Sequence, residues 1–319
     1  MQQRRLAHGR VGAAAAAGRG NMNSFIVCTD SGCDLSIHVL QEHGIIPIRL
    51  KYEIDGEEFE DTMLPEDCHI FYEKMRFGAV PKTSQLNIAD FTDFWRPLLA
   101  QQKPIVHISL GSGVSGTWRN GCLAAEELKQ EFPDAEIHVI DSTLCSVGYG
   151  MLALKAAELR DRGASAGECA VWLEAHKASV NTWYTTDELK YLYRSGRVSR
   201  AGMIVGTALN ICPILNLDRE GHLLVQEKVR GLKKTVRRIH EIVGELVLDA
   251  PGQTAYICHS DIPEQAREFG EGLKAEFGFG EMRYTNIGPT IGSNCGPGLM
   301  AVFFWGRDRD MKENRNEQD

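Results

Sequence analysis

From Ser24 onward, short apolar runs alternate with polar loops and helix-like stretches. The first apolar run is Phe25–Cys28, and a helix-like stretch from Asp34 to His43 follows it. Two further units of this kind begin at Ile105 and Ile137. Strand, loop and helix repeated in this order predict a parallel sheet covered by helices. In such sheets, ligands bind beyond the carboxyl ends of the strands.

The second half of the chain has a different pattern. After a helix-like stretch from Ala166, strand-like runs recur at Cys212–Leu217, Leu223–Lys228, Ala255–His259 and Met300–Trp305. Helices are expected between them, at about 235–248 and 262–277. We therefore predict an α/β protein of two domains. Residues 24–162 form an N-terminal domain with a parallel sheet flanked by helices, and residues 163–306 form a second α/β domain with a mixed sheet.

Composition excludes several classes of protein. The net charge of −8 argues against a nucleic-acid binder, and no stretch approaches the roughly 18 apolar residues of a membrane span. The nine cysteines are scattered, as is usual in a reducing cytoplasm, and the ten histidines show no metal-ligand spacing. We expect a cytoplasmic protein with no metal, no cofactor and no stable membrane insertion. Residues 1–23 are expected to be a disordered extension, and the polar residues 307–319 a disordered tail.

Two hydroxyl-rich segments are candidates for a binding site. Lys82–Gln85 precedes a helix that Asn87 is expected to cap, and Ser109–Thr117 links a strand to a helix. Backbone amides at a helix start, together with hydroxyls and glycine, can bind an anion. Each segment alone is better explained by helix capping and turn formation. Several such loops at equivalent ends of one sheet favour a shared anionic ligand.

The same loop partly matches motifs of enzymes. Gly111, Gly113 and Gly116 have the spacing of a dinucleotide fingerprint, but the acidic residue expected about 20 positions later is missing. A phosphate loop would need a lysine after its second glycine. A nucleophile elbow would need one residue between Ser115 and the next glycine. A small-molecule enzyme or a nucleotide- or phosphate-binding protein remains the alternative, and an interaction protein without a ligand is a third reading.

Eight motifs in series resemble the DegV family, the fatty-acid-binding subunits of bacterial fatty acid kinase. They span about residues 24–306 and are Thr29–Leu35, Lys82–Gln85, Ile108–Thr117, Val139–Ser142, Gly196–Ser199, Ile211–Ile214, Val229–Lys234 and Ile291–Gly298. The resemblance implies a non-catalytic protein that holds a long-chain fatty acid in an internal tunnel. It also implies that a partner kinase subunit phosphorylates the exposed carboxylate.

The resemblance also implies roles for individual residues. The carboxylate ligands fall on Thr83, Ser84 and Ser115. The predicted ligand-binding residues also include Gly116, Asn294 and Cys295, and the last two stand where the family usually has His-Thr. Asn294 can donate a hydrogen bond but cannot carry charge or shuttle a proton. Arg197 matches an arginine on the face that meets the kinase. The basic run Lys228, Arg230, Lys233, Lys234, Arg237 and Arg238 is either a solvated face or part of this docking surface.

Overall fold

The computed structural model describes residues 24–186, 188–198 and 210–309. Its first sheet is entirely parallel and has the strand order β2-β1-β6-β7. The strands are β1 (Ile26–Asp30), β2 (Ile45–Ile48), β6 (Ile105–Ser109) and β7 (Ile137–Asp141). The predicted N-terminal parallel sheet is therefore confirmed. The predicted terminal extension 1–23, and the tail beyond residue 309, lie outside the described residues.

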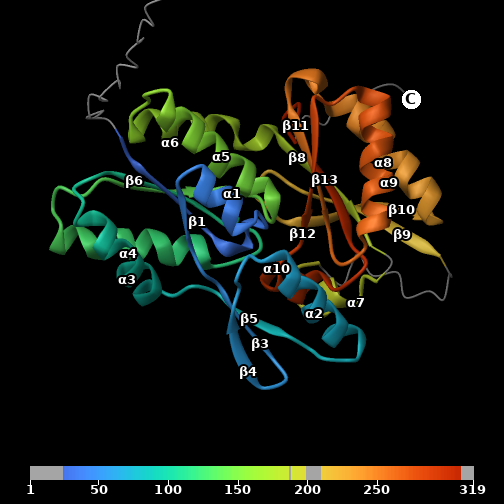
Figure 1. Cartoon of the computed structure of the whole chain (residues 1–319), viewed down its shortest axis with the longest axis horizontal. Helices are drawn as coiled ribbons and strands as arrows, with labels where there is room; N and C mark the ends of the chain where they lie inside the picture. Colours follow the sequence, from blue (N-terminus) through green and yellow to red (C-terminus); the bar gives the residue numbers. More distant parts are fainter. Residues whose placement is uncertain (1–23, 187, 199–209, 310–319) are drawn as a thin grey trace, which may run out of the picture.

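Helices cover both faces of this sheet (Figure 1). They are α1 (Ile37–Glu42), α3 (Ile88–Leu99), α4 (Thr117–Glu131), α5 (Val147–Asp161) and α6 (Ala166–His176). Alternate side chains of β1 point to opposite faces, as expected for a strand buried on both sides. Cys28 packs in the cluster that contains α3 and α4, and Val27 packs in the cluster that contains α5 and α6.

Local signals in the sequence determine where several of these helices begin. Asn87 caps α3, since its side chain accepts a hydrogen bond from the Asp90 amide at 3.0 Å and Asp90 accepts one from the Asn87 amide at 2.8 Å. The predicted capping role of Asn87 is confirmed. The helix expected from Asp34 begins three residues later, because Asp34 adopts a left-handed conformation and Ser36 is the residue that caps α1.

The second sheet is mixed and has six strands in the order β10-β9-β8-β13-β11-β12. They are β8 (Val180–Thr185), β9 (Ile211–Leu217), β10 (Leu223–Arg230), β11 (Thr254–His259), β12 (Glu281–Asn286) and β13 (Met300–Trp305). Among the strand pairs that the structure describes in this sheet, only β11–β12 is parallel. Helices α8 (Leu232–Leu246) and α9 (Pro263–Phe277) pack on this sheet, so the predicted mixed α/β second half is confirmed.

A small third sheet was not predicted. It is antiparallel, with the order β4-β3-β5, and is formed by β3 (Lys51–Ile54), β4 (Glu57–Glu60) and β5 (Lys82–Ser84). Helices α2 (Pro65–Arg76) and α10 (Pro289–Cys295) lie next to it, and α10 contacts both β3 and β5. The other short elements are α7 (Lys190–Arg194) and the 3-10 turns Ser31–Cys33, Lys177–Ser179 and Ala250–Gly252.

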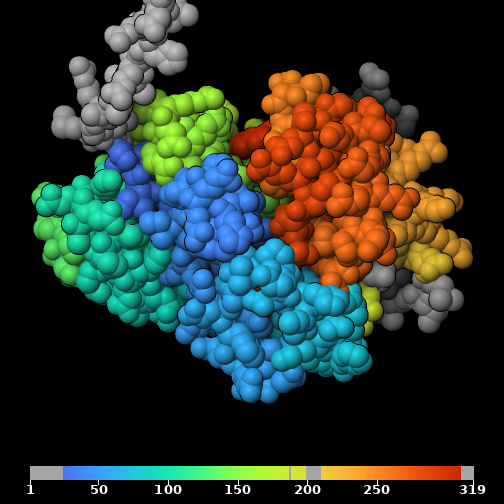
Figure 2. Space-filling view, in the orientation of Figure 1, coloured from blue at the N-terminus to red at the C-terminus, as the bar shows by residue number. Residues whose placement is uncertain are grey.

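Helix α5 joins the two larger sheets. It contacts β1 and β6 of the first sheet and β8 and β13 of the second. Gly148 makes this close approach possible, because a Cβ there would lie 3.2 Å from the ring of Phe303 on β13. One hydrophobic cluster consequently contains residues of both sheets, and Figure 2 shows the blue N-terminal segments in direct contact with the orange C-terminal ones. The division of the chain at residue 162 stays a prediction, and α6, which follows it, packs on β7 of the first sheet.

Candidate functional site

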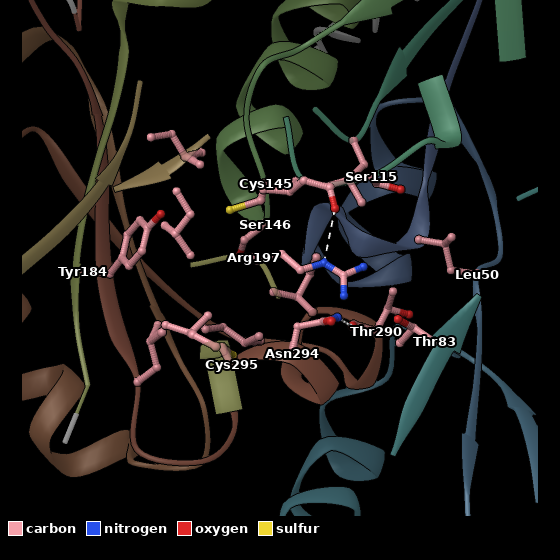
Figure 3. A pocket seen from close by; sticks show the side chains of 18 of the residues that line it. Leu50, Thr83, Ser115, Cys145, Ser146, Tyr184, Arg197, Thr290, Asn294 and Cys295 are labelled. Atoms are coloured by element: carbon pink, nitrogen blue, oxygen red, sulfur yellow. Dashed lines mark hydrogen bonds between the residues drawn. The ribbon is translucent and has the colours of Figure 1, made fainter. Parts of the chain in front are cut away.

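A cavity of about 530 Å³ lies between the two larger sheets. Volumes of 300–1,000 Å³ are typical of pockets that enclose a small-molecule ligand. Side chains from strands of the second sheet line one end, and they are mainly apolar: Tyr184, Leu217, Leu223, Ala301 and Phe303. The other end is lined by β5, the loop before α4, and α10 (Figure 3).

Every predicted ligand-binding residue lines this cavity. Segments that are far apart in the chain come together there and contribute Thr83, Ser84, Ser115, Gly116, Asn294 and Cys295. Ser84 is exposed, whereas Thr83, Ser115 and Asn294 are partly buried. The polar end of the cavity is therefore also its open end. A ligand with a polar head and a long apolar body fits this gradient.

One expectation about the origin of these residues is wrong. Thr83 and Ser115 were expected at equivalent ends of a single parallel sheet. Only the Ser115 loop follows a strand of that sheet, whereas Thr83 lies on β5 of the small antiparallel sheet. The Thr83 segment is too short to indicate which strand it pairs with, and its partner is the equally short and polar β3.

The Ser115 hydroxyl combines a structural role with access to the cavity. Its oxygen accepts a hydrogen bond from the Thr117 amide at 3.2 Å, at the start of α4. The same hydroxyl lies 3.0 Å from the hydroxyl oxygen of Thr117. A hydroxyl hydrogen rotates freely, so Ser115 can redirect its donor to a ligand oxygen while keeping the bond from the amide.

The glycines of the loop before α4 are explained by close backbone packing. A Cβ at Gly111 would lie 2.7 Å from the amide nitrogen of Leu144, and a Cβ at Gly113 would lie 2.3 Å from the carbonyl carbon of Gly221. The space that a pyrophosphate uses in a dinucleotide fingerprint is thus filled by the protein's own backbone at these two positions. Gly116 differs, because its nearest neighbour is the end of the Gln85 side chain, which also lines the cavity.

Buried carboxylates hold the polar end in place. Asp61 accepts hydrogen bonds from the Thr290 hydroxyl at 2.7 Å and from the Met63 amide at 3.2 Å. Asp34 accepts one from the Gly288 amide at 2.8 Å, just before α10. Burial raises the pKa of Asp34 well above its usual range and raises that of Asp61 as well. These bonds tie α10, which carries the Asn294 side chain, to the N-terminal half of the molecule.

A third buried acid supports the Ser115 loop. Asp30, at the end of β1, accepts a hydrogen bond from the Leu110 amide at 3.0 Å and another from the Tyr149 hydroxyl. Burial raises the pKa of Asp30 to about 6. Ser112 anchors the other side of the loop, because its hydroxyl donates to Asp141 at 2.6 Å. The loop is therefore rigidly connected to the ends of β1 and β7.

Two further hydroxyls line the cavity but already have partners. Ser146 donates to the buried carboxylate of Asp34, and Thr290 donates to that of Asp61. Asn294 Nδ2 donates to the backbone oxygen of Thr290 at 3.0 Å, which uses one of its two amide hydrogens. The hydroxyls of Thr83, Ser84 and Ser115 are thus the better candidates for binding a ligand head group.

Arg197 lies at the open end of the same cavity. Its guanidinium donates to the backbone oxygen of Ser195 at 2.6 Å and its Nε to that of Val114 at 3.4 Å (Figure 3). Arg197 is exposed, but neighbouring protein atoms displace part of the water around its guanidinium and lower its pKa. A guanidinium nevertheless remains protonated in proteins. A permanent positive charge therefore stands next to the hydroxyls. The resemblance implied only that Arg197 lies on a docking face, and the structure adds that it lines the cavity.

The basic run predicted as a docking patch is separate from the cavity. It lies on β10 and α8, and none of its residues lines the cavity. Arg238 is paired with Glu227 at 2.9 Å, and Arg237 with Glu241 at 3.4 Å.

Three side chains that could ligate a metal ion lie close together at the β9–β10 turn: Asp218, Glu220 and His222. The Asp218 carboxylate accepts hydrogen bonds from the backbone amide and the ring of His222. These bonds stabilise the turn, and they explain why the three side chains lie close together.

Sequence reasoning missed the residues at the apolar end. Tyr184 and Cys145 line the cavity, and neither belongs to a motif that indicates ligand binding. Tyr184 lies on β8 in a strand segment that includes Trp183, which faces the opposite side of the sheet. Side chains that alternate between the two faces in this way are typical of any buried strand and do not indicate a ligand site.

Among the described residues, no helix has the length and apolar character that crossing a membrane requires.

Comparison with known proteins places this architecture in a family. A family model described as an uncharacterised protein of the DegV family matches residues 24–307. The chain belongs to the DegV family. A DegV domain-containing protein of Clostridium perfringens is 32% identical over 293 residues, which cover 92% of this chain and 100% of that protein. Protein DegV of Bacillus subtilis is 30% identical over 280 residues, covering 87% of this chain and 98% of the relative.

Solved structures of DegV family proteins have the same fold. A DegV family protein from Thermus thermophilus, described by its fatty acid binding, is 28% identical and superposes with a TM-score of 0.76. DegV from Bacillus subtilis, described as a fatty acid binding protein, also has 28% identity and a TM-score of 0.76. In both comparisons 89% of this chain and 99% of the other chain are covered. The two-sheet arrangement is therefore the fold of the family.

Proposed function

We propose that this protein is a non-catalytic carrier that encloses the tail of a long-chain fatty acid and exposes its carboxylate. The observation that carries the proposal is the polarity gradient of the cavity. One end is walled by strand side chains such as Leu217 and Phe303, and the open end by Thr83, Ser84 and Ser115. The fatty acid binding described for the Thermus and Bacillus relatives supports the same ligand class.

The energetics favour a ligand of this shape. Burial of each methylene contributes about 0.8 kcal/mol, so a tail of roughly 14 methylenes contributes about 11 kcal/mol before the entropy costs of binding. Each hydrogen bond to the carboxylate adds about 1.5–3 kcal/mol. The tail therefore supplies most of the affinity. The hydroxyls determine where the head group lies.

The proposal includes a partner. The carboxylate at the open end is the substrate of a separate fatty acid kinase subunit, and Arg197 contributes to the surface that meets that subunit. The exposed position of Arg197 beside the hydroxyls supports this assignment. A carrier that keeps the tail out of water while leaving the head group accessible suits a reaction whose product, an acyl phosphate, is prone to hydrolysis. We place this activity in the cytoplasm.

A thermal-unfolding assay tests ligand binding and head-group recognition together. Palmitic acid should raise the melting temperature, because a ligand that binds only the folded state stabilises it. The alcohol with the same carbon chain is the matched control, and it should stabilise the protein less because it lacks the carboxylate. ATP and inorganic phosphate should have no effect. Stabilisation by ATP or phosphate but not by the fatty acid would overturn the proposal in favour of a nucleotide- or phosphate-binding protein.

A coupled assay tests the partner. Loaded protein, ATP and the kinase subunit should yield acyl phosphate. Arg197→Ala should lower the rate of acyl-phosphate formation more than it lowers fatty acid affinity. An equal loss in both quantities would mean that Arg197 binds the ligand and does not contribute separately to docking.

A further inference from the structure

The side chain of Gln85 bridges the two segments that carry the head-group hydroxyls. Gln85 directly follows β5, the strand of Thr83, and lines the cavity. The end of its side chain reaches the loop before α4, because a Cβ at Gly116 would lie 2.3 Å from Gln85 Oε1 and 3.2 Å from its Nε2. Gly116 directly follows Ser115, and Figure 3 shows Thr83 and Ser115 on either side of Arg197. The Gln85 amide therefore lies where the two hydroxyl-bearing segments meet.

Gly116 leaves room for this amide. Its backbone has φ −80° and ψ 0°, values that residues other than glycine also adopt, so glycine is not required there for its backbone freedom. What a Cβ would obstruct is the Gln85 side chain, to which the three nearest atoms all belong. The missing side chain at Gly116 consequently allows Gln85 to lie against the Ser115 loop.

The Gln85 amide is accessible and has donors to spare. Gln85 is exposed, and among the described residues its side chain makes no hydrogen bond. Asn294 differs, because it uses one amide hydrogen on the backbone oxygen of Thr290. A primary amide offers two N–H donors and one acceptor oxygen. Since Oε1 is the atom nearest Gly116, Nε2 is the atom left to face a ligand.

From these observations we infer that Gln85 is a further head-group ligand, whose Nε2 donates a hydrogen bond to the carboxylate of the bound fatty acid and orients it between Thr83 and Ser115. The inference rests on the proposed function and adds a residue to its binding site. A carboxylate offers about four lone-pair positions, so it can accept bonds from two hydroxyls and an amide together. Water competes for an exposed amide, so loss of this bond should weaken binding by about five- to tenfold.

The first test compares two ligands that differ only in the head group. Dissociation constants of palmitic acid and of the alcohol with the same carbon chain are measured for the natural protein and for Gln85→Leu, which keeps a side chain of similar size without the amide. The affinity for the acid should fall by about five- to tenfold, and that for the alcohol much less, because hydrogen bonds to an ionised acceptor are the stronger ones. Gln101→Leu is the matched control. Gln101 is exposed and does not line the cavity, so both affinities should stay unchanged.

The second test displaces the amide from the other side of the contact. The Cβ of Gly116→Ala would meet the flexible end of the Gln85 side chain, so it moves the amide and leaves the backbone in place. Gly116→Ala should therefore weaken binding of palmitic acid about as much as Gln85→Leu does. The double variant should bind no more weakly than the weaker single variant, because both changes remove the same bond. Losses that add in the double variant would contradict the inference.

The outcomes separate this inference from the proposed function. If Gln85→Leu binds palmitic acid as tightly as the natural protein does, the inference is wrong and the carrier function stands. Equal losses for the acid and the alcohol would also overturn the inference, because they would show that Gln85 shapes the cavity and does not bind the carboxylate. If the natural protein binds neither ligand, both proposals fail.

Discussion

Replacing Ser115 by alanine should weaken both helix α4 and fatty acid binding, by different amounts. The variant loses the bond that the Ser115 oxygen accepts from the Thr117 amide at 3.2 Å. Loss of such a hydrogen bond costs about 1 kcal/mol of unfolding free energy. It also loses one hydrogen bond to the carboxylate, worth about 1.5–3 kcal/mol. The dissociation constant of a fatty acid should therefore rise by about ten- to a hundredfold.

Ser112→Ala is the matched control for this prediction. Ser112 lies on the same loop, but its hydroxyl donates to Asp141 and it does not line the cavity. Its removal should lower the unfolding free energy and leave affinity unchanged. Urea unfolding of ligand-free protein measures the first quantity, and calorimetric titration with palmitic acid measures the second. Equal affinities of Ser115→Ala and Ser112→Ala would refute the assignment of Ser115 to the head group.

Three further changes test other parts of the structure. Ala301→Leu fills the distal end of the cavity, so the affinity for long chains should fall relative to that for shorter ones when a chain-length series is titrated. Burial lowers the pKa of His107 to about 3, so the folded state excludes a proton that the unfolded state binds below about pH 6.5. When the pH is lowered from about 7 to about 5, the unfolding free energy of the natural protein should therefore fall by about 2 kcal/mol more than that of the His107→Phe variant. Urea unfolding at the two pH values measures both losses, and equal losses would contradict this prediction. Gly113→Ala should destabilise by about 1–3 kcal/mol because its Cβ meets the Gly221 backbone, whereas the control Gly167→Ala, with no atom nearer than 3.9 Å, should not.

The elements with strong apolar patterns were predictable from sequence. Strand β13 is a continuous apolar run, and β6 is mainly apolar and buried along its whole length, which is typical of strands buried on both faces. The small sheet was missed because β3 and β4 are short and mostly polar, with sequences KYEI and EEFE. Helix α10 was missed because it has seven residues and contains Gly292, so no helical periodicity is visible. These segments owe their structure to tertiary contacts.

The polar end of the cavity was easier to predict than the apolar end. Glycine, serine and threonine in Ser109–Thr117 indicate an anion site through the chemistry of their backbone amides and hydroxyls. The residues around the tail carry no such signal. Tyr184 is recognisable as unusual only when the fold shows that its hydroxyl is buried without a partner. Which strand faces enclose the cavity depends on how α5 packs between the two sheets.

Mass spectrometry of the protein purified from bacterial cells tests the central claim most directly. Under native conditions the spectrum should show the protein with an additional mass equal to that of a long-chain fatty acid. Under denaturing conditions the additional mass should disappear, and organic extraction should recover the acid. A ligand-free native spectrum, unchanged after incubation with long-chain fatty acids, would contradict the account.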